Sequence, residues 1–376
     1  MTLFPAVIGF LIVAVVLWEA FETIVLPRRV ARRWRITVLF YRVTWFPWRS
    51  LAHAIKRTRL RETLLSFYGP LSLLCLFIFW AGALIVGFGL LYRSAAVANA
   101  ISQSISTCVY LSGTTFFTLG LGDVVPHVGV ERLLAVTESG LGFGFLALVL
   151  SYLPVIYQAF SRREVNIVLL DARAGSPPTA CELLRRHTGP GGVEALDQVL
   201  HDWERSAADI LESHVSYPAV SYFRSQHNNE SWLAAFTAIL DATALVLTGV
   251  ENIASRQARL TFAICRHTVV DLTQVFNLRP HRGDADRLPA GELQRLRTAL
   301  AQAGVQLRDD EAAVAKLVKL REMYEPYLRA LSDFLHMELP PWILAKEITD
   351  NWRTSAWGRI TGFSSSGPRE PDDHAD

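Results

Sequence analysis

Residues 112–126 read Ser-Gly-Thr-Thr-Phe-Phe-Thr-Leu-Gly-Leu-Gly-Asp-Val-Val-Pro and lie between two long apolar segments. Within this stretch, Gly120 and Gly122 alternate with leucines. Glycine adopts backbone conformations that are closed to other residues, so successive carbonyl groups can turn toward one axis. Carbonyl oxygens arranged around an axis can replace the hydration shell of a cation. The stretch therefore predicts a backbone-lined cation filter.

The same residues resemble the pore signature of potassium channels, which reads T-x-x-T-x-G-x-G-D. Its positions are filled here by Thr115, Thr118, Gly120, Gly122 and Asp123. The resemblance covers about residues 64–160, and an additional span before them makes the chain look like a three-span bacterial potassium-channel-like protein. It implies a passive potassium channel rather than an enzyme, with K⁺ as the permeant ion and no cofactor.

The resemblance also implies a role for each residue of the filter. Thr118 would bind K⁺ through its hydroxyl and its carbonyl oxygen. Further carbonyl ligands for K⁺ would come from Leu119, Gly120 and Leu121. Gly122 would permit the backbone to turn outward after the last ion site.

Two more residues would support the filter from outside it. Thr115 would belong to the end of the pore helix, and Asp123 would anchor the outer end of the filter by a hydrogen bond behind it. One loop supplies one quarter of a ring of carbonyls, so a single filter per chain implies a homotetramer.

The stretch departs from the commonest family pattern at several positions. Leu121 stands where most members have Tyr or Phe, whose ring braces the filter, and Leu119 replaces the usual Val. Tyr110 and Leu111 stand where many members have paired tryptophans. Two alternatives follow: a weakly selective monovalent cation channel, or a non-conducting membrane-anchored signalling or scaffold protein that acts through residues 161–350.

The composition places the chain in the membrane class. Of its 376 residues, 51% are hydrophobic and 19% are charged, and the apolar excess is concentrated before residue 160. A membrane part followed by a soluble part is the interpretation that fits this asymmetry. The four cysteines show no C-x-x-C spacing, which argues against a zinc site and a disulfide framework.

The apolar segments predict the topology. Membrane spans are expected at 4–26, 64–92 and 130–157, whereas 104–117 is too short to cross and predicts a re-entrant pore helix. The basic loop at 28–62 belongs in the cytoplasm, which puts the N-terminus of this multi-pass cell-membrane protein outside and its C-terminal domain in the cytoplasm. The expected divisions are 1–62, 63–160, 161–350 and 351–376, the last of them disordered.

Arginines and aromatic residues interleave at residues 28–61. Between membrane spans, this pattern favours segments at the lipid headgroups and binding of anionic lipid, and it disfavours nucleic acid. Before the loop, Glu19 and Glu22 share one helical face. Either they lie at the interface near the arginines, or they make a polar contact with the pore bundle.

The last span contains candidates for gating or packing. Gly140, Gly142 and Gly144 give a small-residue face that allows close packing or a bend. Pro154 is a candidate for a kink near the cytoplasmic end. Glu138 is an ionisable residue within a span and is therefore a functional candidate by default.

Beyond residue 160 the pattern predicts an α-helical bundle, so the whole chain is expected to be all-α. A helical stretch after 161 breaks at 175–178. Further helices are expected at 181–187, 193–214, 231–250, 262–276 and 311–335. The segment 231–250 is apolar enough to ask whether it is a fourth span, and Asp241 at its centre argues against insertion.

No catalytic or nucleotide-binding motif is found in this half, and the gating ligand stays unknown. A voltage sensor is not indicated either, because no predicted span carries arginines at every third residue. The most suggestive polar group consists of His214, Tyr217, His227 and Glu230. Either it seats a metal ion, or its members are ordinary surface and capping residues.

Overall fold

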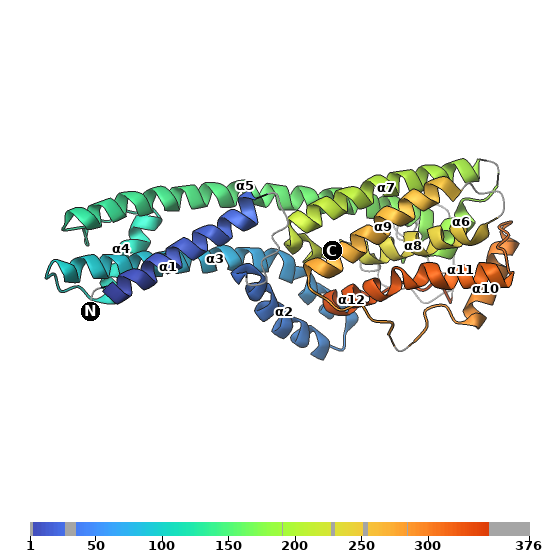
Figure 1. Cartoon of the computed structure of the whole chain (residues 1–376), viewed down its shortest axis with the longest axis horizontal. Helices are drawn as coiled ribbons and strands as arrows, with labels where there is room; N and C mark the ends of the chain where they lie inside the picture. The colour runs from blue at the N-terminus through green and yellow to red at the C-terminus, as the bar shows by residue number, and fades with distance from the viewer. Residues whose placement is uncertain are drawn as a thin grey trace, which may run out of the picture. The chain divides into compact units, whose positions relative to one another are not determined.

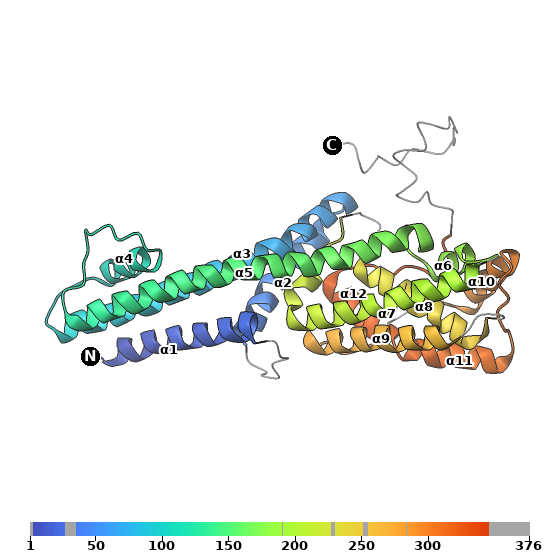
Figure 2. The same cartoon turned by 90° about the horizontal axis from the view of Figure 1, so that it is seen from above.

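The computed structural model describes residues 3–26, 35–189, 191–226, 230–250, 255–283 and 285–345. The chain divides into two compact units, Met1–Gln158 and Ala159–Asp376, and Figures 1 and 2 show helices throughout both. The tail at 351–376, which was expected to be disordered, lies outside the described residues. So does His227 of the polar group.

The chain is an all-α membrane protein. Across the described ranges the β-type pairing consists of one isolated antiparallel bridge between Val250 and Leu307. Among the described residues, four helices are long and apolar enough to cross a membrane. They are Leu3–Val25, Thr58–Ala98, Gly129–Ala174 and Trp232–Gly249.

In the first unit, the N-terminal helix packs closely on the next apolar helix. Helix α1 (Leu3–Ala20) ends in a π-helical turn at Phe21–Val25, and α3 runs from Thr58 to Ala98. A Cβ atom built on Gly9 would lie 2.6 Å from the carbonyl oxygen of Gly87. Only glycine permits such an approach of two backbones, which is the usual device for packing helices in a membrane.

Helices occur at all three predicted spans and at the predicted pore helix. Helix α4 spans Ile105–Phe116 and packs on α3 at one end of the long helices (Figure 1). Helix α5 runs from Gly129 to Ala174, well beyond the predicted end at 157. It stops where Gly175 adopts a left-handed backbone with φ 84°.

The predicted basic loop contains a helix that the sequence pattern did not indicate. Helix α2 runs from Ile36 to Ala54 and packs on α3 through aromatic side chains. The rings of Trp45 and Tyr68 lie 4.6 Å apart, and Trp48 Nε1 donates to the carbonyl oxygen of Leu64 at 3.0 Å. The aromatics interpreted as headgroup contacts therefore include side chains that hold α2 against α3.

The two glutamates of the first span lie beside the start of α2. Glu19 Oε2 accepts from the backbone N–H of Thr37 at 3.2 Å and from its hydroxyl at 2.9 Å. Glu22 lies 3.8 Å from the guanidinium of Arg35. A carboxylate at an uncapped helix N-terminus satisfies an otherwise unpaired N–H group and complements the helix dipole. The interfacial interpretation, with the glutamates near the arginines of the loop, fits this arrangement.

The second unit is a bundle of shorter helices that follow the end of α5. Thr179, Ser231 and Asp310 each cap a helix by accepting a hydrogen bond from a backbone N–H with their side chains. The helices are α6 (Ala180–Arg186), α7 (Gly192–Ser216), α8 (Trp232–Gly249), α9 (Ser255–Val275), α10 (Ala290–Gln302), α11 (Glu311–Glu322) and α12 (Glu325–Leu335), with a 3₁₀ turn at Pro218–Tyr222.

Helix α8 forms the core of this bundle. Its most apolar window is 83% buried, and it contacts α6, α9, α11 and α12. Asp241 at its centre pairs with Arg287 at 2.7 Å and accepts from the Tyr324 hydroxyl at 2.7 Å. A buried carboxylate with a cation and a hydrogen-bond donor is satisfied inside protein.

Two expectations for the C-terminal half need correction. Residues 311–335 form two helices, α11 and α12, because the chain turns at Met323–Tyr324 and Pro326, at the start of α12, has no N–H to continue a helix. Helix α10 was missed, although Pro289 at its N-cap and Glu292 in its first turn are typical start signals.

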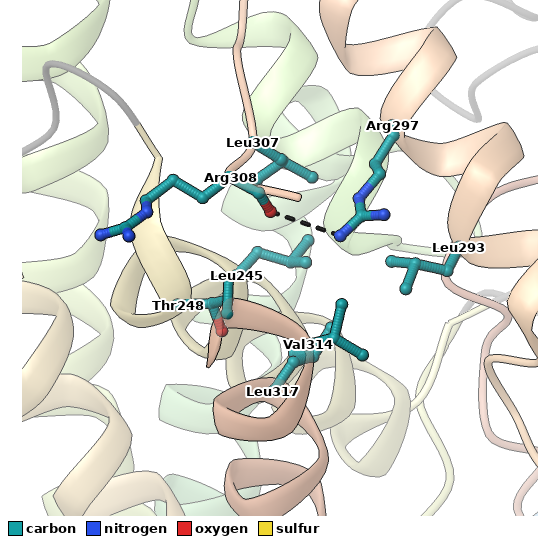
Figure 3. Close-up of a pocket in the computed structure, with 9 residues that line it drawn as sticks. Leu245, Thr248, Leu293, Arg297, Leu307, Arg308, Val314 and Leu317 are labelled. Carbon is teal, nitrogen blue, oxygen red and sulfur yellow. Dashed lines mark hydrogen bonds between the residues drawn. The ribbon is translucent and has the colours of Figure 1, made fainter. Parts of the chain in front are cut away.

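A small apolar pocket lies at the C-terminal end of α8 (Figure 3). Arg297 Nη2 closes one side by donating to the carbonyl oxygen of Arg308 at 3.3 Å. The other lining residues include Leu245, Thr248, Leu293, Leu307, Val314 and Leu317. The guanidinium of Arg297 is turned to the backbone, so the pocket presents mainly aliphatic groups.

Candidate ion-conducting site

The helix that leads into the predicted filter is fixed at its start and along its side. Ser104 caps α4 by accepting from the Thr107 N–H at 3.1 Å. A Cβ atom on Gly89 of α3 would lie 2.7 Å from a methyl carbon of Val109, so α3 and α4 touch at backbone distance. The Ser112 hydroxyl donates to the carbonyl oxygen of Ile85 at 2.8 Å, which fixes the rotation of α4 on α3.

The backbone after α4 alternates in handedness. Thr118, Gly120 and Gly122 have φ angles of 57°, 56° and 80°, whereas Leu119 and Leu121 between them are not among the residues with positive φ. A regular change of handedness at every second residue is found in neither a helix nor a strand, and glycine at two of the three left-handed positions permits it. Thr118 takes up this conformation despite its branched Cβ, at a cost of about 1–3 kcal/mol.

The start of the filter is joined to the end of the pore helix by backbone hydrogen bonds. The N–H of Leu119 donates to the carbonyl oxygen of Thr114 at 2.8 Å, and the N–H of Thr118 donates to that of Thr115 at 3.0 Å. The last carbonyls of a helix have no partners within it. Here the N–H groups of Thr118 and Leu119 are the partners of these carbonyls, so a shift of α4 moves the filter with it.

The outer end of the filter is tied to the first half of the pore helix. The Tyr110 hydroxyl donates to Asp123 Oδ2 at 2.8 Å, and Asp123 Oδ1 accepts from the Val124 N–H at 3.0 Å. The resemblance implied a hydrogen bond to Asp123 without naming its donor. Tyr110 was noted only as a departure from the paired tryptophans, and the signal that could have identified it was its donor hydroxyl.

One side of the filter is open in the protomer. Leu119 and Leu121 are 61% and 63% exposed. A Cβ atom on Gly120 or Gly122 would meet nothing within 4 Å. Residues 119–122 are therefore uncovered on one side in the protomer.

The small residues of α5 do not share one environment. A Cβ atom on Gly142 would overlap the carbonyl group of Phe116 at the end of α4, whereas one on Gly140 or Gly144 would meet nothing within 4 Å. Pro154 is exposed, and the helix continues through it. Of these four predicted residues, Gly142 is the one brought to the back of the filter.

Glu138 also lies behind the filter. Its side chain is fully buried, and its Oε1 atom contacts the Ser112 hydroxyl. Thus α5 meets α4 at Glu138 and again one turn later at Gly142. Both contacts are made to one face of α4, which carries Ser112 and Phe116.

Comparison with known proteins agrees with this geometry. Residues 67–158 match a protein-family model described as "Ion channel". An uncharacterized membrane protein, YdjJ, from Bacillus subtilis is 23% identical over 195 residues, which cover 50% of this chain and 56% of the relative. Protein LctB from Geobacillus stearothermophilus is 31% identical over 86 residues, which cover 19% of this chain and 63% of that protein.

The chain thus spans less than two thirds of each of these relatives. No solved structure gives a significant match. The family match begins in α3 and ends in α5, so it contains the pore helix, the alternating backbone and Gly142. The matched residues are thus similar to an ion-channel family, and the match supports a potassium-channel-like family for this part of the chain.

Proposed function

We propose that the protein is a potassium channel that conducts K⁺ passively through a homotetrameric pore. The observation that carries the proposal is the alternating backbone at residues 118–122, with positive φ at Thr118, Gly120 and Gly122. Carbonyls turned to one side of the chain offer K⁺ a row of oxygen ligands. The Thr118 hydroxyl adds a ligand at the inner end, and the carbonyls of Leu119, Gly120 and Leu121 complete the row.

A ring of four chains supplies what the protomer lacks. The filter needs facing carbonyls from other copies, and its open side would receive them. The surface of α5 supports the same assembly, because its most apolar window is only 11% buried in the protomer. Large apolar side chains exposed there include Val130, Leu133, Val136, Phe143, Leu146 and Leu150.

The proposed topology follows from charge. The basic residues at 28–61 would lie in the cytoplasm, where they meet anionic lipid. The chain would then place Asp123 at the outer mouth of the pore and residues from 159 onward in the cytoplasm. The helical unit there would assist assembly or gating.

The test is ion flux through the purified full chain in liposomes. Under opposed K⁺ and Na⁺ gradients we expect a reversal potential close to that of K⁺. Gly120→Ala should abolish conduction while membrane insertion persists, because alanine is strained at φ 56° and its methyl group would narrow the ion path. Gly82→Ala is the matched control, since a Cβ atom at this helical glycine of α3 meets nothing within 4 Å.

Three results would overturn the proposal. A monomer in detergent would exclude the four-fold ring. Unchanged flux in Gly120→Ala would remove the filter from these residues. Absence of flux in the wild type would favour a membrane-anchored signalling or scaffold protein.

A weakly selective cation channel is the second candidate. The observation that favours it is Leu121, which is 63% exposed and provides no aromatic ring to brace the filter. A wild-type reversal potential near zero, with flux intact, would establish this candidate in place of the first.

A further inference from the structure

The pore helix is held from behind by two contacts in register. On α5, Glu138 and Gly142 lie at i and i+4, and they meet Ser112 and Phe116, which lie at i and i+4 on α4. Residues with this spacing share one face of a helix. Because Phe116 ends α4 just before Thr118, this double contact sets the position of the first filter residue relative to α5.

Within the described residues, the structure shows no ion pair to Glu138. Its side chain and those of Ser112 and Tyr92 around it are fully buried. Its Oε1 atom contacts the Ser112 hydroxyl, whereas its Oε2 atom has no hydrogen-bond partner in the described part of the chain. An ionised carboxylate without a cation is costly at such a site.

The number of hydrogen atoms available for these contacts indicates whether the Glu138 carboxyl group is protonated. The Ser112 hydroxyl has one hydrogen but lies in contact with two acceptors, the Ile85 carbonyl oxygen and Glu138 Oε1. A carbonyl oxygen can only accept. If Ser112 donates to Ile85, the second contact is a hydrogen bond only when Glu138 carries a proton and donates to Ser112 Oγ.

We propose that Glu138, as a neutral carboxylic acid, is a positioning residue of the selectivity filter. Glu138 on α5 contacts Ser112 on the pore helix, and Ser112 in turn bonds to Ile85 on α3. These contacts hold the carbonyls of residues 118–122 at the spacing that distinguishes K⁺ from Na⁺. This role rests on the proposed potassium conduction. It would compensate for Leu121, which leaves the filter without an aromatic brace.

The experiment compares variants of the full chain in liposomes under opposed K⁺ and Na⁺ gradients. Glu138→Ala and Ser112→Ala should lower the K⁺/Na⁺ permeability ratio by about tenfold or more, the equivalent of about 1.4 kcal/mol of differential ion binding. Glu138→Gln should restore a ratio close to the wild type, because the amide donates a hydrogen bond without a charge. Ser139→Ala on the same helix is the matched control and should leave the ratio unchanged.

A second measurement reads the carboxyl group directly. The infrared difference spectrum between wild type and Glu138→Gln should contain the band of a protonated carboxyl group. An unchanged permeability ratio in Glu138→Ala, equal damage by Glu138→Gln and Glu138→Ala, or absence of the band would each overturn the proposal. Equal damage by Glu138→Gln and Glu138→Ala is expected if Glu138 is ionised and the Ser112 hydrogen is shared between Glu138 and the Ile85 carbonyl oxygen.

Failure of this inference can be separated from failure of the proposed function. A wild type without K⁺ preference contradicts potassium selectivity itself, and the infrared band then decides the state of Glu138. If Glu138→Ala fails to assemble, Ser112→Ala, which removes a single oxygen atom, supplies the permeability ratio.

Discussion

Helices α5 and α8 are both apolar enough to cross a membrane, and each contains a buried acid, Glu138 in the first quarter of α5 and Asp241 at the middle of α8. Asp241 meets a guanidinium and a phenol, whereas Glu138 meets the Ser112 hydroxyl. In the most apolar 18-residue segment of α8, 83% of the residues are buried, whereas in that of α5 only 11% are buried. Hydropathy alone does not distinguish these two helices, whereas their burial and the partners of their buried acids do.

The largest expected effect is at the ion pair of α8. Asp241→Ala would remove one of the two acidic partners of buried Arg287 and leave Glu325, and loss of one partner of a buried pair costs about 3–5 kcal/mol. We expect the second unit to unfold at a much lower temperature, as measured by circular dichroism of the full chain in detergent. Asp197→Ala, at an exposed position of α7, is the control. Equal melting of both variants would contradict a structural ion pair in α8.

A smaller effect is expected at the phenol that completes this pair. Burial raises the pKa of Tyr324 well above its ordinary value, and Asp241 raises it further, so the hydroxyl remains a donor. Tyr324→Phe should cost about 1.5–3 kcal/mol, the usual contribution of a hydrogen bond to a charged group. Chemical denaturation of the two proteins measures the difference. A change below about 0.5 kcal/mol would show that Arg287 alone satisfies Asp241.

A buried histidine beside an arginine gives a pH-dependent effect. His214 Nε2 lies 3.2 Å from Arg163 Nη1, and burial, with Arg163 second, holds the pKa of His214 well below its ordinary value. The unfolded chain therefore binds the extra proton, and stability is lost as pH falls below about 6.5. The expected slope is about 1.4 kcal/mol per pH unit.

Melting temperatures across that range measure the slope in the second unit. His214→Gln should flatten the curve, because glutamine supplies polar atoms but binds no proton. A curve of the same steepness in this variant would assign the pH dependence to another group.

The smallest effect is expected at an exposed carboxylate. Tyr110→Phe removes the donor to Asp123 at the outer end of the filter. Because this bond is open to solvent, water can replace it, and we expect K⁺ flux to fall by less than about tenfold. Asp123→Asn, which keeps an acceptor for the phenol, should retain more flux than Tyr110→Phe. The reverse order would show that the charge of Asp123, rather than its bond to Tyr110, supports the filter.

Much of the fold could be predicted from the sequence because its signals are local. Gly120 and Gly122 indicated the unusual backbone, and the length of each apolar segment indicated its helix. The break of 311–335 also had a local cause, Pro326, which was overlooked. Helix α2 was harder to predict, because its aromatics are as compatible with lipid as with α3.

The back of the filter could be predicted only in part. Glu138 was singled out as an ionisable group within a span, and Gly142 as one of three similar glycines. Their partners on α4 follow from the rotation and register of two helices. No pattern within either helix determines how it is turned toward the other, so Ser112 was not singled out.

The contact between Gly9 and Gly87 separates two events in the assembly of this protein. Insertion of α1 depends on its hydropathy, which a larger side chain at Gly9 would preserve or increase. Docking of α1 depends on the absence of that side chain, because a single Cβ atom would already collide with the backbone of α3. Helix α1 can therefore insert into the bilayer during synthesis before α3 is present to pack against it. A change at Gly9 would leave α1 inserted but not packed on α3.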